Sequence, residues 1–183
     1  MLPAPSGARA VVVGGTAWHV VAADVEPEWV AAQTAADPLS APLGARFLAA
    51  LADRVGAEPG CLDAVLVAPP AERSTGVQLR PAEPDHPRVH RALRYRSDVR
   101  IWRTADGTGL LTVGRGVAGR LEVSLEVEPG AQGHGLGTAL AAAAPALVSE
   151  PLWAQVAPAN VASLRAFLAA GYRPVGAEVL FGL

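Results

Sequence analysis

The chain has 183 residues, of which 51% are hydrophobic, and its formal net charge is −2 with a sequence pI near 6.1. This size predicts one domain, or one domain with an N-terminal elaboration. The chain is acidic overall and its basic residues are all arginine, so its global charge excludes general attraction to nucleic acid or to an anionic membrane.

The single cysteine and the longest apolar run further limit the kinds of protein that this chain can be. Cys61 is alone, which excludes an intrachain disulfide and offers no metal-ligand cluster, so we expect no metal site. The longest uninterrupted apolar run, residues 139–148, is well short of the roughly 20 residues that span a membrane. No secretion signal is visible at the N-terminus. We therefore expect a cytoplasmic protein without a membrane partner.

The N-terminal part predicts a hairpin, two helices and a strand. Two β-branched runs within residues 9–22 flank Gly14-Gly15, a pair that tolerates the positive φ angles of a tight turn. The helices and the strand are expected at residues 27–36, 43–55 and 62–67, and Gly56 is the expected cap of the second helix.

A loop separates this part from the rest of the chain. Residues 70–86 contain prolines, glutamates and a glycine, which favour irregular backbone. We place a boundary here, between a divergent N-terminal region at residues 1–75 and a core at residues 76–183. One continuous domain is the alternative.

The core predicts alternating strands and helices. The expected elements are a helix at 87–96, strands at 98–104, 109–114 and 120–127, a helix at 134–148, a strand at 152–156, a helix at 160–170 and a β-pair around 172–182. Asp106-Gly107 is the expected turn between the first two strands. Pro145 is expected to kink or shorten its helix, because proline lacks a backbone donor. This order predicts an α+β fold with helices packed on a central mixed, mostly antiparallel sheet.

The most informative stretch is the turn between the strand at 120–127 and the helix after it. Its sequence is Val127-Glu128-Pro129-Gly130-Ala131-Gln132-Gly133-His134-Gly135-Leu136-Gly137-Thr138. Glycines lack Cβ atoms, so several backbone N–H groups of this turn can point at one spot. The first N–H groups of a helix have no intrahelical partner and carry partial positive charge. The turn is therefore predicted to bind phosphate through its backbone. A tight turn that only needs flexible residues is the alternative for this motif taken alone.

Two motifs resemble the GNAT acetyltransferase superfamily. Gln132-x-x-Gly135-x-Gly137 resembles that family's acetyl-CoA pyrophosphate loop, and Val127-x-Pro129 resembles the strand end before it. Further along, the helix that begins near Asn160 and the exit Gly171-Tyr172 are similar to the family's second motif, in the same order. The resemblance extends from about Ser97 to the C-terminus.

The resemblance implies a GNAT-like fold and an acetyl-CoA-dependent N-acetyltransferase. Acetyl-CoA would be the acyl donor, and an amine of a small molecule, peptide or protein the acceptor. An acyl-CoA-binding regulatory module with little or no catalysis is the alternative, and either could be a monomer or a homodimer. The residues implied to contact acetyl-CoA are Leu125, Val127, Gln132, Gly133, His134, Gly135, Leu136, Gly137, Thr138, Asn160 and Ser163. Asn160 would bind the pantetheine arm or cap its helix, and the two roles are compatible.

Glutamates on the strand before the loop are candidates for the general base. Glu122, Glu126 and Glu128 share one face, because side chains alternate along a strand. Glu122 is the first candidate, since it lies nearest to where the family places its strand glutamate, and Glu126 is the second. The alternative is a polar face without a catalytic role.

The general acid departs from the family pattern. A tyrosine commonly lies seven residues after the motif's asparagine, and here that position is Phe167, which has no proton to donate. Tyr172 is expected to pack in the core. The leaving thiolate would then be stabilised by water and backbone dipoles, another side chain would donate the proton, or the activity would be weak.

Six arginines gather between residues 86 and 103. Arg88, Arg91 and Arg94 recur every third residue and so share one side of the expected helix. A solvated face paired with acidic residues is the first interpretation, and contact with an anionic substrate or an adenine nucleotide is the second. Nucleic-acid binding ranks third, and we expect no such partner.

Overall fold

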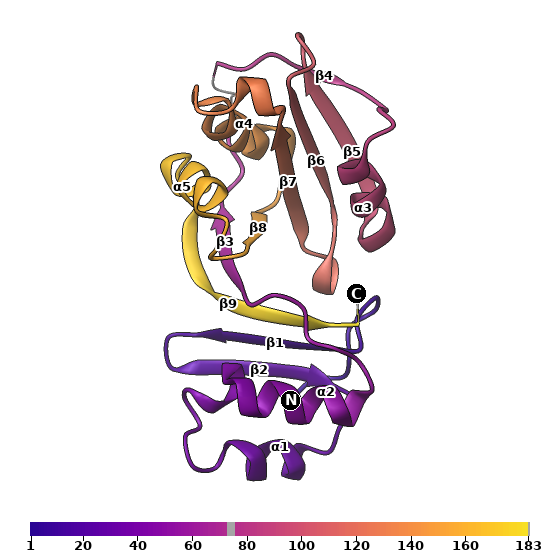
Figure 1. Ribbon diagram of the computed structural model, residues 1–183, viewed down its shortest axis with the longest axis vertical. Helices are drawn as coiled ribbons and strands as arrows, with labels where there is room; N and C mark the ends of the chain where they lie inside the picture. The colour runs from indigo at the N-terminus through magenta and orange to yellow at the C-terminus, as the bar shows by residue number, and fades with distance from the viewer. Residues whose placement is uncertain (73–75, 183) are drawn as a thin grey trace. The chain divides into compact units, whose positions relative to one another are not determined.

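A computed structural model describes residues 1–72 and 76–182. In these ranges the chain forms five α-helices and nine strands, and the strands belong to a mixed, mostly antiparallel sheet (Figure 1). The expected α+β class is confirmed. The chain divides into two compact units, one formed by Met1–Val65 together with the last strand from Val175, the other by Leu66–Pro174.

The domain boundary itself stays a prediction. The expected border between residues 75 and 76 adjoins residues 73–75, which lie outside the described residues, as does Leu183 at the end of the expected core. Within the described ranges, no helix has the length and apolar character needed to cross a bilayer.

The first unit packs helices on one face of three strands. Its strands run in the order β2-β1-β9 with antiparallel pairing, and its elements are β1 (Ala10–Gly15), β2 (Trp18–Ala23), α1 (Pro27–Thr34), a 3₁₀ turn (Ala41–Leu43), α2 (Ala45–Val55) and most of β9 (Arg173–Phe181). β3 (Asp63–Ala68) leads into the second unit. The core of the first unit contains Val12, Phe47 and Phe181, all buried. Gly56 caps α2 as expected, with φ +65°.

Gly14 and Gly15 do not form the hairpin turn, contrary to expectation. They pair with His19 and Trp18 inside the β1–β2 ladder, and the turn falls on the next two residues, with Ala17 at φ 61°. A Cβ at Gly15 would lie 2.5 Å from the Trp18 indole, and one at Gly14 would lie 2.7 Å from the His19 ring. The two glycines therefore make room for side chains of the neighbouring strand.

The expected β-pair around 172–182 is also wrong, because Arg173–Phe181 is one continuous strand. β9 passes through Gly176 without a turn and pairs with β1 from Gly14↔Ala177 to Ala10↔Phe181. A Cβ at Gly176 would overlap the carbonyl oxygen of Gly14. Glycine is needed there for the close approach of two backbones, not for a change of direction.

The second unit holds most of the predicted core. Its strands follow the order β3-β8-β7-β6-β5-β4. Its elements are β4 (Leu79–Pro81), α3 (Pro87–Tyr95), β5 (Ser97–Thr104), β6 (Gly109–Arg115), β7 (Leu121–Val127), α4 (Leu136–Ala143), β8 (Leu152–Val156) and α5 (Val161–Ala169), with 3₁₀ turns at Val117–Gly119, Pro129–Ala131 and Ala144–Leu147. The short β4 lies inside the expected loop. Pro145 stands in the 3₁₀ turn that replaces the end of the expected long helix, so the shortening is confirmed.

The two faces of this unit's sheet carry different side chains. On one face, Leu111 and Val123 pack with Leu140 of α4 and Phe167 of α5 in the buried core. On the other face, α3 packs on β5 and β6, and in Figure 1 it lies on the opposite side of β7 from α4 and α5. We call the β6 and β7 positions on the α3 side the polar face; its members are Thr112, Glu122, Ser124 and Glu126.

Candidate functional site

The loop from β7 to α4 turns through two left-handed glycines. Gly133 has φ +79° and Gly135 φ +83°, a region that disfavours any residue with a Cβ. Gly135 is also the N-cap of α4 and offers no side chain to the free end of that helix. Gly137 is different, because a Cβ there would make ordinary contact, 3.8 Å from the Cβ of Ala166. Glycine is therefore required at two of the three expected positions.

The same loop leaves a run of backbone donors free. The first bond of α4 is donated by Ala139 to the Gly135 carbonyl at 3.0 Å. Among the described residues, no group accepts from the N–H groups of residues 133–138. His134 and the two left-handed glycines are exposed, and residues 136–138 are half-buried. Gln132 ties the loop back to the strand, since its Nε2 donates to the Val127 carbonyl at 3.0 Å. The result is an accessible set of N–H groups at a positive helix end.

The strand before the loop separates from its parallel neighbour. β7 pairs with β8 only at Leu121↔Leu152 and Glu122↔Trp153 in the part of the chain that the structure describes. On its other edge, β7 stays paired with β6 along its whole length. The two parallel strands therefore part after their first residues, on the way to the loop.

The backbone of β7 presents donors at this split. Glu128 donates its N–H to the Thr108 carbonyl on the β6 side. Because N–H groups alternate between the two edges of a strand, those of Leu125 and Val127 point toward the β8 side. These two half-buried residues are the ones expected to polarise a carbonyl.

The second motif begins α5 beside α4. Asn160 caps α5, and its Oδ1 accepts from the Ser163 N–H at 3.1 Å. Asn160 is exposed and Ser163 half-buried. The capping role expected for Asn160 is confirmed, while its contact with pantetheine stays a prediction.

The first candidate base, Glu122, lies in a buried cluster of charges. Its carboxylate accepts from Arg96 Nε at 3.1 Å, from Arg120 Nε at 2.9 Å and from the Val117 N–H at 3.2 Å. Only 3% of the residue is exposed, and a Cβ at Gly116 would overlap the carboxylate. Burial lowers the pKa of the Arg96 guanidinium, and the Glu122 carboxylate opposes that shift. The oxygens of Glu122 are thus already occupied by protein donors.

The second candidate, Glu126, shares the polar face but reaches solvent. Its side chain is 41% exposed, and Oε2 accepts from Arg88 Nε at 2.6 Å. His86 Nε2 lies 3.8 Å from Oε1. Glu128, next along this side of the chain, is exposed and lies 3.8 Å from Arg103 Nη2. Of the two candidate bases, Glu126 is therefore the one that solvent can reach.

Comparison with known proteins finds likeness in fold. No protein-family model matches the sequence, and no curated protein does. An acetyltransferase of the GNAT family from Colwellia psychrerythraea is 11% identical and aligns over 90% of this chain and 75% of its own, with a TM-score of 0.51. The fold is GNAT-like.

Two further solved structures are GCN5-related N-acetyltransferases. The protein from Kribbella flavida is 17% identical over 74% of this chain, with a TM-score of 0.49. The protein from Sphaerobacter thermophilus is also 17% identical, over 73% of this chain, with a TM-score of 0.44. The chain spans 63% and 54% of their lengths, respectively.

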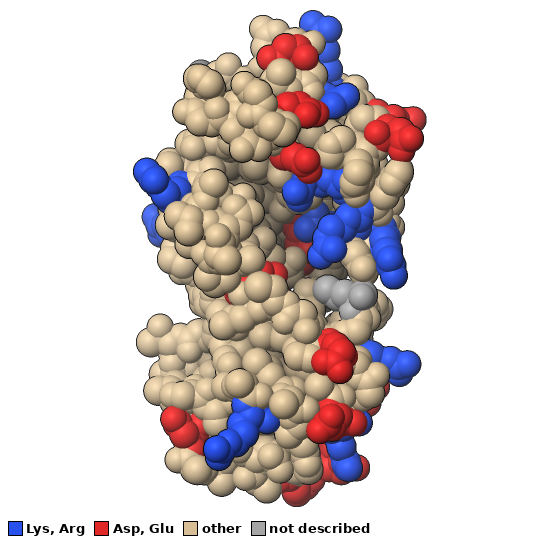
Figure 2. Space-filling view, viewed as in Figure 1, with Lys and Arg blue, Asp and Glu red and all other residues tan. Residues whose placement is uncertain are grey.

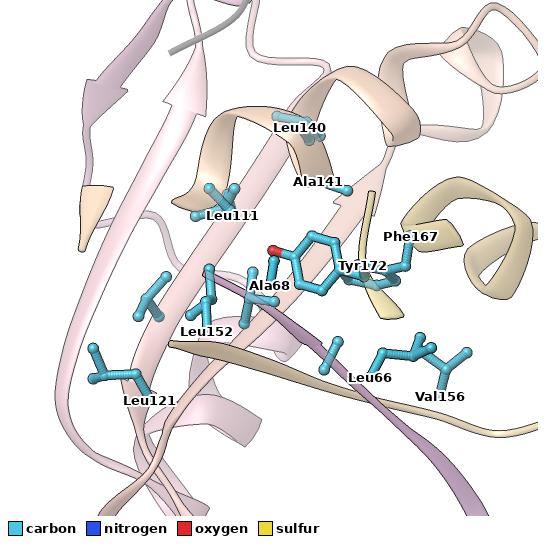
Figure 3. Close-up of a cluster of buried hydrophobic side chains, with 14 residues drawn as sticks. Leu66, Ala68, Leu111, Leu121, Leu140, Ala141, Leu152, Val156, Phe167 and Tyr172 are labelled. Atoms are coloured by element: carbon cyan, nitrogen blue, oxygen red, sulfur yellow. The ribbon is translucent and has the colours of Figure 1, made fainter. Parts of the chain in front are cut away.

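In this GNAT-like fold, the position of the expected acid belongs to the core. Phe167 is buried and packs edge-to-face on Tyr172, with ring centroids 4.9 Å apart. Figure 3 shows both rings in the cluster, with the Tyr172 hydroxyl directed away from Phe167. Tyr172 is buried as expected, burial raises the pKa of its hydroxyl, and that oxygen has no hydrogen-bond partner among the described residues.

We expect Tyr172→Phe to leave the protein as stable as before, or more stable by about 1 kcal/mol, because it removes an unpaired buried hydroxyl. Chemical denaturation followed by circular dichroism measures the difference. Tyr95→Phe, at the half-buried end of α3, is the matched control and should change little. A loss of stability confined to Tyr172→Phe would mean that the hydroxyl has a partner.

The prediction that the arginines between residues 86 and 103 pair with acidic residues is confirmed for some of them. Arg88 and Arg96 do pair with acidic residues, as the first interpretation held, and their partners are Glu126 and Glu122. What sequence reasoning missed is that Glu122 is buried by these contacts. Arg120, two residues before Glu122 on the same side of the chain, was an available signal; nothing local linked Arg96 to a residue 26 positions away.

Proposed function

We propose that the protein is an acetyl-CoA-dependent N-acetyltransferase that acts on an amine of a small molecule, peptide or protein. The observation that carries the proposal is the run of free N–H groups at residues 133–138, at the end of a strand that parts from its parallel neighbour. A pyrophosphate needs several donors that converge without a competing acceptor. An acyl-pantetheine arm needs a gap between strands with backbone donors at its edge. The free N–H groups of the loop and the short β7–β8 pairing among the described residues support the proposal.

The position of each group of residues suggests which part of acetyl-CoA it would bind. The loop at 132–138 would hold the pyrophosphate of acetyl-CoA, and the exposed amide of Asn160, with Ser163, would bind the pantetheine arm. The N–H groups of Leu125 and Val127 would donate to the thioester oxygen as negative charge develops on it. Acetyl-CoA supplies the activated acyl group, and the chain supplies orientation and donors.

The amine must lose a proton before or during attack. Of the two candidate bases, Glu126 is accessible from solvent, whereas the carboxylate of Glu122 is enclosed by arginines. We therefore place the proton transfer at the Glu126 carboxylate, directly or through one water. Phe167 cannot protonate the leaving thiolate, so water and the backbone dipoles of the loop would stabilise it.

Glu126→Gln should lower kcat/KM about 100-fold, a typical contribution of a general base. The acidic limb of the pH profile of kcat/KM should change, while the affinity for acetyl-CoA stays the same. Glu128→Gln is the matched control, because Glu128 is the next exposed carboxylate and also faces an arginine. Unchanged kinetics in Glu126→Gln would mean that the amine arrives already neutral.

The direct test of the proposal is calorimetry with acetyl-CoA and with CoA. Binding in the micromolar range, with one site per chain, is the expected result. Absence of binding by folded protein at high micromolar ligand would end the proposal.

The alternative is a module that binds acyl-CoA without efficient catalysis, and the burial of Phe167 in place of a proton donor favours it. Mass spectrometry of amines incubated with acetyl-CoA separates the two functions. Acetylated product supports the enzyme. Acetyl-CoA binding without product, and without thiol release above background, supports the module.

A further inference from the structure

Arg91 is an exposed cation on α3. Arg88, three residues before it, binds Glu126, and Arg96, five residues after it, binds Glu122. No carboxylate lies within 4 Å of the Arg91 guanidinium in the described ranges of the chain. Its guanidinium instead stacks on the Tyr95 ring, 5.2 Å from the centroid. Arg91 is exposed and therefore free to meet a ligand.

Arg91 is the neighbour of Arg88 on the surface of α3, because side chains three residues apart on a helix lie side by side. The positive charges of both residues also lower the pKa of Arg96, after the larger effect of burial. Within the described ranges, Arg88 and Arg96 have a carboxylate partner and Arg91 has none. Nearby, Arg103 keeps a buried Nε without an acceptor among the described residues, and its Nη2 is 3.8 Å from Glu128.

This side of the molecule is therefore positively charged within an acidic chain. Arg88, Arg96, Arg103 and Arg120 lie beside the three carboxylates of Glu122, Glu126 and Glu128, and Arg91 adds a fifth positive charge next to Arg88 on α3. Figure 2 shows blue side chains gathered where Figure 1 places α3 and β5. Such a field attracts anions and repels polycations.

We propose that the acceptor amine carries an anionic group, a carboxylate or a phosphate, which Arg91 binds beside the Glu126 carboxylate. The inference rests on the proposed function and names its substrate class. A guanidinium binds such an oxyanion through two parallel N–H donors. Residues three apart on a helix have Cβ atoms about 5–6 Å apart, so Arg91 and the Arg88–Glu126 pair can hold the two ends of one small amino acid-like molecule. Polyamines, aminoglycosides and basic peptides do not fit this charge pattern.

The test compares amines that differ only in the anionic group. Acetyl-CoA is incubated with L-phenylalanine or phenethylamine, with L-lysine or cadaverine, and with O-phosphoethanolamine or ethanolamine, and product is measured by mass spectrometry. In at least one pair, the member that carries the anionic group should have a kcat/KM at least ten times that of the member without it. The carboxylate and phosphate pairs show which oxyanion the site takes.

Arg91→Gln tests the residue itself. It should raise KM for the preferred anionic acceptor at least tenfold with little change in kcat, and should weaken binding of the N-acetylated product equally. The matched control is Arg94→Gln, on the same helix, whose guanidinium lies over the same ring at 5.3 Å. The control should leave KM within twofold of the wild type.

The outcomes separate this inference from the proposed function. A preference for the members of the pairs that lack the anionic group, or equal effects of the two substitutions, overturns the inference but not the proposed acetyltransferase function. Acetyl-CoA binding without acetylation of any anionic amine also overturns it. If calorimetry detects no acetyl-CoA binding, the proposed function fails and the substrate class falls with it.

Discussion

Replacement of Gly135 by glutamate is expected to abolish acetyl-CoA binding. Gly135 stands at φ +83° at the start of α4, among the free N–H groups of residues 133–138. A carboxylate there would compete for the same donors and would repel a pyrophosphate. Loss of two charge-assisted hydrogen bonds alone corresponds to about 3 kcal/mol, or roughly 100-fold in Kd. Calorimetry measures the change.

Two further variants separate charge from backbone strain. Gly135→Ala places a Cβ at this strained φ without adding a carboxylate, and we expect a much smaller loss of affinity for acetyl-CoA. Gly56→Glu places the same side chain at φ +65° at the end of α2 in the first unit, with no heavy atom within 4 Å of its Cβ. It should leave acetyl-CoA binding unchanged. Retained affinity in Gly135→Glu would mean that the phosphates bind elsewhere.

Glu122→Gln is expected to lower the free energy of unfolding by roughly 3 to 5 kcal/mol, because Arg96 and Arg120, which are largely enclosed, then lose the carboxylate that both bind. The Arg96 and Arg120 side chains are only 13% and 15% exposed, so water cannot replace the carboxylate. Gln matches Glu in shape, so the loss reflects charge more than packing. Chemical denaturation at neutral pH measures it.

The matched control for this substitution is Glu150→Gln. Glu150 binds Arg115 at 2.6 Å, but their side chains are 49% and 37% exposed, respectively. An exposed pair contributes little, so the denaturation midpoint should barely move. Similar behaviour of the two variants would mean that the Glu122 cluster is not a structural element. The expected result also means that activity lost in Glu122→Gln must be corrected for the unfolded fraction before any catalytic role is assigned to Glu122.

The sequence by itself determined those features that depend only on residues close to one another in the chain. Free N–H groups at a helix start, glycines that accept φ above +75° at 133 and 135, and an asparagine N-cap all depend on neighbours within a few residues. The apolar alternation of β7 and the break at Pro145 are of the same kind. The expected loop, the order of elements and the GNAT-like fold could therefore be predicted.

Tertiary structure alone decided which distant groups meet. Gly14 and Gly176 look like turn residues in sequence, and only the pairing of β1 with β9 shows that their backbones need close approach. The Glu122 carboxylate looks like an available base until Arg96, 26 residues away, is seen to bury and bind it. Between the paired Arg88 and Arg96, Arg91 and Arg94 have no carboxylate within 4 Å among the described residues. Such roles depend on which charges the fold brings within a few ångströms, and Coulomb energy depends on that distance and on burial, neither of which local sequence encodes.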